Sequence, residues 1–296
     1  MTTRAVVLGG GGPVGVAWES GLAAGLEEEG LSLRDADLFV GTSAGSIVGS
    51  QLALGRPARE LYEAQLSIAG GDRPEMRPVQ RSIDIGPVIQ AFVKMYTSDL
   101  PREQLRREMG EFALNAQAMS EEEWLSTFGR ESNFISWPDR AFVCTAIDTA
   151  TGAFVTWDKE SGVPLGLAVA SSCAVPGVVT PITINGRRYM DGGMGSGTNA
   201  ELAAGYERVL VVPVFAVGRP RPGANEAVVA RLRQRFEDEL EAIRIAGGDL
   251  SVISPDDESR EAFGPNLMDG TRRQPVAEAG LRQGRLEALR LRDWWN

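Results

Sequence analysis

Residues 4–30 read RAVVLGGGGPVGVAWESGLAAGLEEEG, and this stretch decides the fold class. The apolar run at 4–8 is typical of a short buried strand, and it leads directly into four glycines at 9–12. Residues 14–30 predict a helix, because small and apolar side chains recur on one side of it and Gly30 follows as a stop signal. A strand, a glycine turn and a helix in this order predict one unit of an α/β fold.

The same order repeats directly downstream. Residues 37–40 (DLFV) predict a second strand, GTSAG occupies residues 41–45, and residues 44–54 predict a helix rich in small side chains. Two such units in succession imply a parallel sheet with helices packed on its faces. Residues 58–128 predict mainly helices, which we expect to form an insertion or cap.

The rest of the chain extends the α/β pattern. It predicts strands at 140–147, 153–157, 208–215 and 249–253, a hairpin at 181–190 with an Asn185-Gly186 turn, and helices at 164–177, 224–245 and 276–295. We therefore expect a three-layer α/β fold with a mainly parallel central sheet, helices on both faces and a helical cap. We expect one domain over residues 1–296, made of a core at about 4–215, the cap at about 58–128 and a C-terminal α/β extension at about 216–296.

The composition excludes several classes of function. The 296 residues carry a formal net charge of −10, which disfavours binding to nucleic acid or anionic lipid through bulk electrostatics. The chain contains no histidine, so Ser-His-Asp and Cys-His catalysis and histidine-ligated metal sites are excluded. Cys144 and Cys173 lie in apolar runs and are expected to be buried free thiols, and the acidic run 256–258 is expected to be a solvated loop. No signal peptide or transmembrane stretch is recognisable, so we expect a cytoplasmic protein.

The glycine cluster permits two functional interpretations. Gly10, Gly12 and Gly15 fit the pattern G-x-G-x-x-G between a strand and a helix, and Asp35 or Asp37 follows about twenty residues later, as in a dinucleotide-binding oxidoreductase. Glycines at such a turn also let backbone N–H groups, with the helix dipole behind them, bind the oxyanion of an acyl-transfer intermediate. The cluster alone does not decide between a pyrophosphate and an oxyanion.

The pentapeptide GTSAG also has two interpretations. Ser43 could be the N-cap of the helix that follows, since serine is a common cap. It could instead be a nucleophile at a strained strand-to-helix elbow, where Gly41 and Gly45 leave space around the hydroxyl. The positive end of the helix at 44–54 would then face the serine oxygen.

A nucleophilic serine needs a base to accept its proton, and no histidine is present. Asp191 is the best-placed candidate, because it follows an apolar hairpin strand and because Gly192 and Gly193 leave room for another backbone to approach. A plain turn aspartate is the alternative, since Asp-Gly is a frequent turn dipeptide. The coincidence of a glycine loop, a serine elbow and a chain without histidine favours the base.

Together these three segments resemble the patatin-like phospholipase family. GGGGPVG at 9–15 is similar to its oxyanion loop, GTSAG at 41–45 to its nucleophile elbow and DGG at 191–193 to its base motif. The sequence ASSCAVPGVVTPITINGRRYM before DGG adds to the likeness, which spans about residues 4–215. The resemblance implies a patatin-like α/β fold. It also implies a serine hydrolase that acts on carboxylic ester bonds of lipids, such as a phospholipase A or lysophospholipase, without cofactor or metal.

The resemblance also implies a role for each matching residue. Ser43 would be the nucleophile and Asp191 the base of a Ser-Asp dyad that works through an acyl-enzyme. The oxyanion donors would be Gly10, Gly11 and Gly12. The supporting motif residues would be Gly15, Gly41, Gly45, Gly192 and Gly193. The chain departs from the family at Val14, where many members have a basic residue that could help to hold an anionic substrate.

Several alternatives stay open at this point. A dinucleotide-binding oxidoreductase would leave GTSAG and DGG without a role. A thioesterase or acyltransferase would use the same active site. A non-catalytic binding protein would have an active site that has lost its activity. The expected partner is a lipid or other acyl-ester substrate in an apolar groove, which residues 58–128 and 133–138 could line, and no nucleic acid is expected. The basic helix at 276–295 ends in Trp294-Trp295, which either close the core or make a peripheral membrane contact.

Overall fold

The computed structural model describes residues 2–69, 86–129, 136–214 and 225–296. These residues form an eight-stranded sheet in the order β5-β6-β3-β2-β1-β7-β8, with β4 paired to β3 beside this path. The strands are β1 (Arg4–Leu8), β2 (Leu38–Gly41), β3 (Ala141–Asp148), β4 (Phe154–Trp157), β5 (Ile182–Ile184), β6 (Arg187–Asp191), β7 (Arg208–Val212) and β8 (Asp249–Val252). The chain combines this central sheet with helices before, between and after its strands, which confirms the predicted α/β class.

The central part of the sheet is parallel, as predicted. β3, β2, β1, β7 and β8 run in the same direction, whereas β4, β6 and β5 are joined by antiparallel pairing. The chain builds the sheet outward from β1 through β2 to β3 and later returns to the other side of β1 with β7. The carboxyl ends of β1 and β7 therefore flank a topological switch point, which is where open α/β sheets bind ligands.

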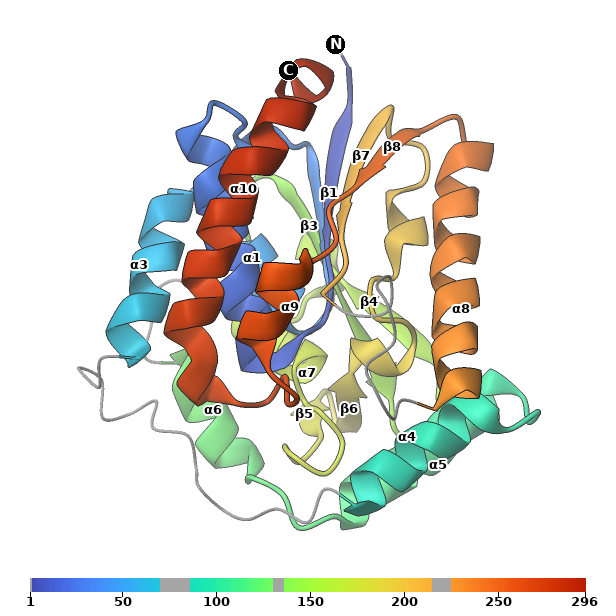
Figure 1. Cartoon of the computed structure of the whole chain (residues 1–296). Coiled ribbons are helices and arrows are strands. Elements are labelled where there is room, and N and C mark those ends of the chain that lie inside the picture. The colour runs from blue at the N-terminus through green and yellow to red at the C-terminus, as the bar shows by residue number, and fades with distance from the viewer. Residues whose placement is uncertain (1, 70–85, 130–135, 215–224) are drawn as a thin grey trace.

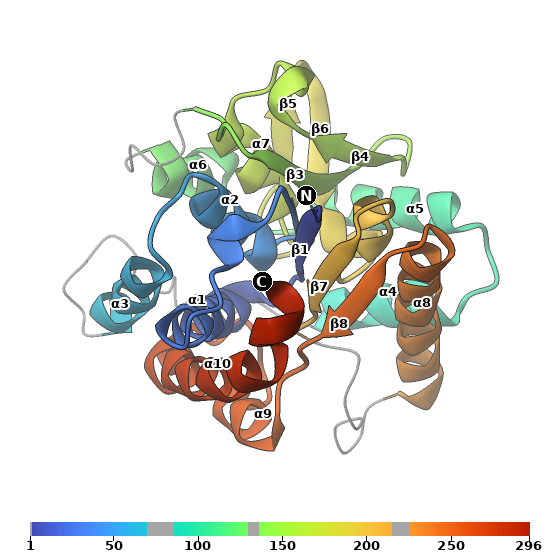
Figure 2. The same ribbon diagram turned by 90° about the horizontal axis from the view of Figure 1, so that it is seen from above.

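Alternate residues of the central strands face two apolar layers, because successive side chains of a strand point to opposite faces. Val6 and Leu8 of β1 pack in one core with the helices α1 (Gly12–Glu28), α2 (Ala44–Ala53) and α10 (Arg273–Trp295). Ala5 and Val7 pack in a second core with α8 (Glu226–Ile245). Figures 1 and 2 show α1 and α10 on one side of the sheet and α8 on the other, which confirms the prediction of helices on both faces.

The region predicted as a helical cap contributes helices that pack on different parts of the body. α3 (Ala58–Ala69) packs against α1 and α10, α4 (Gly86–Thr97) packs against α8 and α5 (Arg102–Asn115), and α6 (Glu121–Gly129) packs against α7 (Leu165–Ser172). α6 begins with the expected capping box, in which Ser120 Oγ accepts a hydrogen bond from Glu123 N and Glu123 Oε2 accepts one from Ser120 N. Part of the proposed groove lining at 133–138 lies outside the described residues.

α1 and α10 run side by side in the same direction and touch through glycines. A Cβ atom added at Gly280 would lie 2.4 Å from the carbonyl oxygen of Trp18, and one added at Gly284 would lie 2.3 Å from that of Leu22. Both helices advance by four residues between these two contacts, which shows that they are parallel. Any larger residue at 280 or 284 would therefore clash with the backbone of α1. Figure 2 shows the two helices side by side.

Two local predictions differ from the structure. The helix predicted at 164–177 ends at Ser172, well before Pro176, because residues 173–175 turn toward the end of β6. The acidic run 256–258 was wrongly predicted as a loop. Asp256 is the N-cap of α9 (Asp257–Phe263) and accepts a hydrogen bond from Ser259 N at 2.8 Å.

Other expectations agree with the structure. Cys144 and Cys173 are buried free thiols. Trp295 is fully buried and donates to the carbonyl of Ser32 at 3.0 Å, while Trp294 donates to Asp249, so both tryptophans pack on the protein itself. Within the described ranges, no helix has both the length and the apolar character that crossing a bilayer requires.

Candidate active site

The glycine loop and the serine elbow lie next to each other at the carboxyl ends of β1 and β2. The amide of Gly45 donates to the carbonyl of Gly9 at 3.0 Å. A Cβ atom at Gly45 would lie 2.0 Å from the carbonyl oxygen of Leu8, and one at Gly41 would lie 2.5 Å from Cα of Ser46. Both glycines of the elbow are therefore required for the start of α2 to fit against β1 and β2.

Ser43 has the strained backbone of a nucleophile elbow. Its φ of 51° and ψ of −115° lie in a region that residues with a side chain rarely adopt, which costs about 1–3 kcal/mol. Ser43 is at the N-cap position of α2, but its side chain makes no capping hydrogen bond. Its side chain instead lies close enough to the carboxyl group of Asp191 to lower the pKa of that group. The simple N-cap alternative therefore does not explain this serine.

Asp191 is the last residue of β6, and it is only 3% exposed. Burial raises the pKa of its carboxyl group from 3.8 to about 7, although hydrogen bonds from Ser43 and from the Gly193 amide oppose the rise. The Gly193 N–H donates to Asp191 Oδ1 at 2.7 Å. A Cβ atom at Gly192 would lie 2.1 Å from Thr145 Oγ1, so this glycine permits the turn after Asp191 to press against β3.

The strand register explains why Ser43 and Asp191 meet. Gly41 of β2 is paired with Cys144 of β3, so Ser43, two residues further on, is level with Ala146. Asp191 of β6 is paired with the same Ala146 from the other side of β3. Two residues about 150 positions apart in sequence thus lie level with each other, on either side of β3.

The last residue of α7 and the residues that follow it hold both Ser43 and Asp191 in place. Ser172 Oγ accepts a hydrogen bond from Ser43 N at 3.0 Å, and the thiol of Cys173 donates to the carbonyl of Ser43 at 3.2 Å. The carbonyl of Ala174 accepts a hydrogen bond from Asp191 N at 3.0 Å. The only signal in the sequence was the stretch SSCAVP, which carried part of the family likeness.

The amides of the glycine loop are not equivalent. The Gly10 N–H donates to the carbonyl of Gly197 at 2.8 Å, so it is not available to an oxyanion in this conformation and the prediction for Gly10 needs correction. Within the described part of the chain, the amides of Gly11 and Gly12 have no acceptor. They lie at the N-terminus of α1, whose dipole favours a negative charge. Gly15 lets α1 pass close to the elbow, since its Cβ would lie 3.1 Å from that of Ala44.

Val14, the departure from the family pattern, is fully buried. Its amide donates to the carbonyl of Leu267 at 3.3 Å, and a Cβ atom at Gly12 would lie 2.8 Å from that same oxygen. The loop before α10 therefore covers this part of the glycine turn. Residue 14 contributes packing and supplies no charge to a substrate.

A second buried carboxyl group lies behind the loop. Glu19 of α1 is 1% exposed, and burial raises its pKa well above the usual value, with a smaller opposing effect of the Gly9 backbone. Neither of its carboxyl oxygens has a hydrogen-bond donor among the described residues, because the Gly9 N–H is already donated to Val212. No group of three or more Cys, Asp or Glu side chains in the described ranges is arranged to hold a metal ion.

The sequence matches a known protein family. The family model for patatin-like phospholipase matches residues 6–204, so the chain belongs to the patatin-like phospholipase family, a family of lipid ester hydrolases. The matched range includes all three motifs.

Two solved structures are similar to the chain over nearly its whole length. VipD from Legionella pneumophila is similar over 98% of this chain and 67% of its own, with a TM-score of 0.47 and 14% identity. The type III effector protein ExoU is similar over 98% of this chain and 53% of its own, with a TM-score of 0.42 and 14% identity. No curated protein sequence matched the chain.

Proposed function

We propose that this protein is a lipid acyl hydrolase in which Ser43 is the nucleophile and Asp191 the general base. The observation that carries the proposal is that a serine on a strained elbow meets a buried carboxyl group, whose pKa burial raises to about 7. A base with a pKa near the working pH accepts a proton effectively and still exists in its ionised form. An ordinary aspartate, with a pKa of 3.8, would be a weaker base.

The reaction proceeds in two halves. Asp191 accepts the proton of Ser43, and Ser43 Oγ attacks the carbonyl carbon of the ester. The carbonyl oxygen becomes an oxyanion, and the amides of Gly11 and Gly12 donate hydrogen bonds to it. The intermediate collapses, the alcohol part of the lipid leaves with the proton from Asp191, and the acyl group stays on Ser43.

Water completes the cycle. Asp191 accepts a proton from a water molecule, whose oxygen attacks the acyl-enzyme. The second intermediate releases the fatty acid, and the proton returns from Asp191 to Ser43. Each oxyanion donor typically lowers the activation barrier by about 3–4 kcal/mol. Two amides therefore account for a large share of catalysis.

The proposal is tested by labelling with a fluorophosphonate probe, which reacts covalently with activated serines. We expect an adduct on Ser43 in the wild type, located by peptide mass spectrometry, and none in Ser43→Ala or Asp191→Asn. Hydrolysis of a p-nitrophenyl fatty acyl ester should be lost in parallel. A folded wild-type protein that gives neither adduct nor hydrolysis, with lipid micelles present, would refute the hydrolase.

A thioesterase or acyltransferase would use the same acyl-enzyme, and a comparison of oxygen esters, thioesters and added alcohol acceptors separates these reactions. Family membership favours lipid esters as substrates. A cytoplasmic location and a peripheral membrane contact remain predictions, and the buried Trp295 does not serve such a contact.

A further inference from the structure

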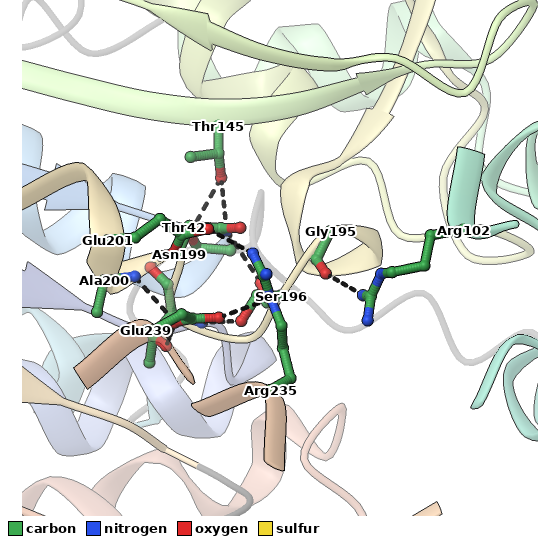
Figure 3. A network of polar contacts seen from close by, with 11 residues as sticks. Thr42, Arg102, Thr145, Gly195, Ser196, Asn199, Ala200, Glu201, Arg235 and Glu239 are labelled. Atoms are coloured by element: carbon green, nitrogen blue, oxygen red, sulfur yellow. Dashed lines mark hydrogen bonds and ion pairs between the residues drawn. The ribbon is translucent and has the colours of Figure 1, made fainter. Parts of the chain in front are cut away.

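Asn199 belongs to a buried polar network that also contains Thr42, Thr145 and Glu239 (Figure 3). Its side chain is 1% exposed. Its Nδ2 group contacts three oxygens: Thr42 Oγ1 at 2.9 Å, Ser196 O at 3.0 Å and Thr145 Oγ1 at 3.4 Å. These oxygens belong to the serine elbow, to β3 and to the loop after Asp191, so one amide group joins the three segments that form the site.

The chemistry of this position suits asparagine. The carbonyl oxygen of Ser196 can only accept a hydrogen bond, so the nitrogen of the amide must face it. Asn199 has a left-handed backbone, with φ 54° and ψ 42°, which asparagine tolerates better than most residues with a side chain. Asn199 Oδ1 has no donor among the described residues, so the side chain acts through its nitrogen.

Glu239 of α8 fixes the backbone on both sides of Asn199. Its Oε2 accepts hydrogen bonds from Thr198 Oγ1 at 2.5 Å and from Ala200 N at 2.9 Å. Arg235 lies one helical turn earlier, and its Nε is 3.1 Å from the other carboxyl oxygen of Glu239. Glu239 is only 1% exposed. A helix on the far face of the sheet therefore holds Asn199 in its unusual conformation.

The loop after Asp191 is also fixed from its other end. Arg102 of α5 donates to the carbonyl of Gly195 at 2.6 Å, as Figure 3 shows. The loop between Asp191 and β7 is thus held by α5 at Gly195 and by α8 around Asn199. Between these two points, the loop is joined to Thr42 of the serine elbow by the Asn199 amide at 2.9 Å and by the carbonyl of Thr198 at 3.3 Å.

The partners of Asn199 adjoin the two reacting groups. Thr42 directly precedes Ser43, and the hydroxyl of Thr145 touches Gly192, which directly follows Asp191. Building on the proposed function, we propose that Asn199 is a positioning residue, whose amide sets the distance between the Ser43 hydroxyl and the Asp191 carboxyl group. A displacement of about 1 Å in such a pair can cost about 100-fold in rate.

The test variant is Asn199→Gly, because glycine accepts the left-handed backbone and removes only the amide. We expect kcat for the acyl ester to fall about 100-fold while KM stays within about threefold, since substrate contacts are unchanged. The pH at which kcat is half-maximal should also rise. The hydrogen bond from Ser43 lowers the pKa of Asp191, and this effect is lost when the two groups separate.

The matched control is Ser259→Ala. Ser259 is also fully buried and makes side-chain hydrogen bonds to Trp18 and Gln283, but it lies in α9, away from the site. We expect this variant to lose stability and to keep the wild-type kcat and pH profile. If Asn199→Gly does not fold, Thr42→Val removes the hydroxyl that Asn199 contacts, together with its bonds to Thr145 and Thr198, and should also lower kcat.

Separate results overturn the two proposals. If the wild type is labelled at Ser43 and hydrolyses esters, but a folded Asn199→Gly keeps its kcat and its pH profile, Asn199 is not a positioning residue. The same conclusion follows if Ser259→Ala loses kcat to the same extent. If the wild type is neither labelled nor active, the proposed function itself has failed.

Discussion

The substitution Asp191→Asn should stabilise the fold at neutral pH while it abolishes catalysis. The carboxyl group of Asp191 has a pKa of about 7 in the folded protein, because burial disfavours its charge, against an ordinary value of 3.8. The folded state therefore binds this proton more tightly than the unfolded state. Stability from this group is fully present below pH 4 and is lost as the pH rises toward 7.

The magnitude follows from the separation of the two pKa values. About three pH units lie between them, and each unit corresponds to about 1.4 kcal/mol. The wild type thus loses about 4 kcal/mol from this residue between pH 4 and pH 8. Asparagine keeps a similar shape and has no proton to lose. The difference in unfolding free energy between variant and wild type should rise from near zero at pH 4 to about 4 kcal/mol at pH 8.

The assay is urea denaturation of both proteins at several pH values, followed by tryptophan fluorescence. Taking the difference between the proteins cancels every other titrating group that they share. A difference that stays flat from pH 4 to pH 8 would refute the raised pKa, and with it the argument for an effective base. In the wild type, kcat should rise with pH through about 7, since the base acts only in its ionised form.

Asp148, at the end of β3, gives a control of opposite sign. Burial would raise the pKa of its carboxyl group, but the Arg187 guanidinium and hydrogen bonds from Thr151 outweigh burial, and the pKa lies below its usual value. This group stabilises the fold above its unfolded pKa, and the contribution is lost as the pH falls. Asp148→Asn should therefore destabilise the protein at neutral pH, and its deficit should shrink toward acid.

Two further predictions concern stability. Glu19→Gln should become progressively more stable than the wild type as the pH rises above about 4, by up to about 1.4 kcal/mol per pH unit. The reason is that burial raises the pKa of Glu19, so the folded state resists losing this proton. A difference in urea midpoint between variant and wild type that is the same at pH 5 and pH 8 would contradict this. Gly280→Ala should destabilise the fold by about 1–3 kcal/mol, since the new Cβ would lie 2.4 Å from the Trp18 carbonyl oxygen. Gly49→Ala, also within a helix, is its control, because the new Cβ would lie 3.5 Å from Leu8, at ordinary contact distance; thermal unfolding should show a lower Tm for the first variant alone.

The local patterns of the sequence predicted much of the fold. The strand, glycine turn and helix at 4–30 and the elbow at 41–45 follow from short-range periodicity and turn chemistry, and the structure has these elements at nearly the same bounds. The meeting of Ser43 with Asp191 was predicted because three motifs coincided in a chain without histidine. The catalytic roles of these residues remain proposals.

Contacts between distant segments could not be predicted in this way. The Gly10 amide is occupied by Gly197, and nothing near Gly10 in the sequence indicates that partner. Glu239 follows two other acidic residues in a helix rich in charge, so it looks like a surface residue, yet it is buried beside Asn199. Such contacts depend on the crossing of β7 and α8 back to the first strands, which no local pattern encodes.

The glycine contact between α1 and α10 has a consequence for biosynthesis. Gly21 of α1 packs on the backbone of Ala277, a residue that the ribosome adds 256 positions later. At translation rates of about 5–20 residues per second, the helix that begins at the glycine loop waits roughly 10 to 50 s for its neighbour. During that interval, the face of α1 that later packs on α10 lacks its partner. The glycine loop, which Gly197, Val212 and Leu267 hold, gains the last of these contacts only when residue 267 has been added. We therefore expect the proposed hydrolysis to appear only late in synthesis.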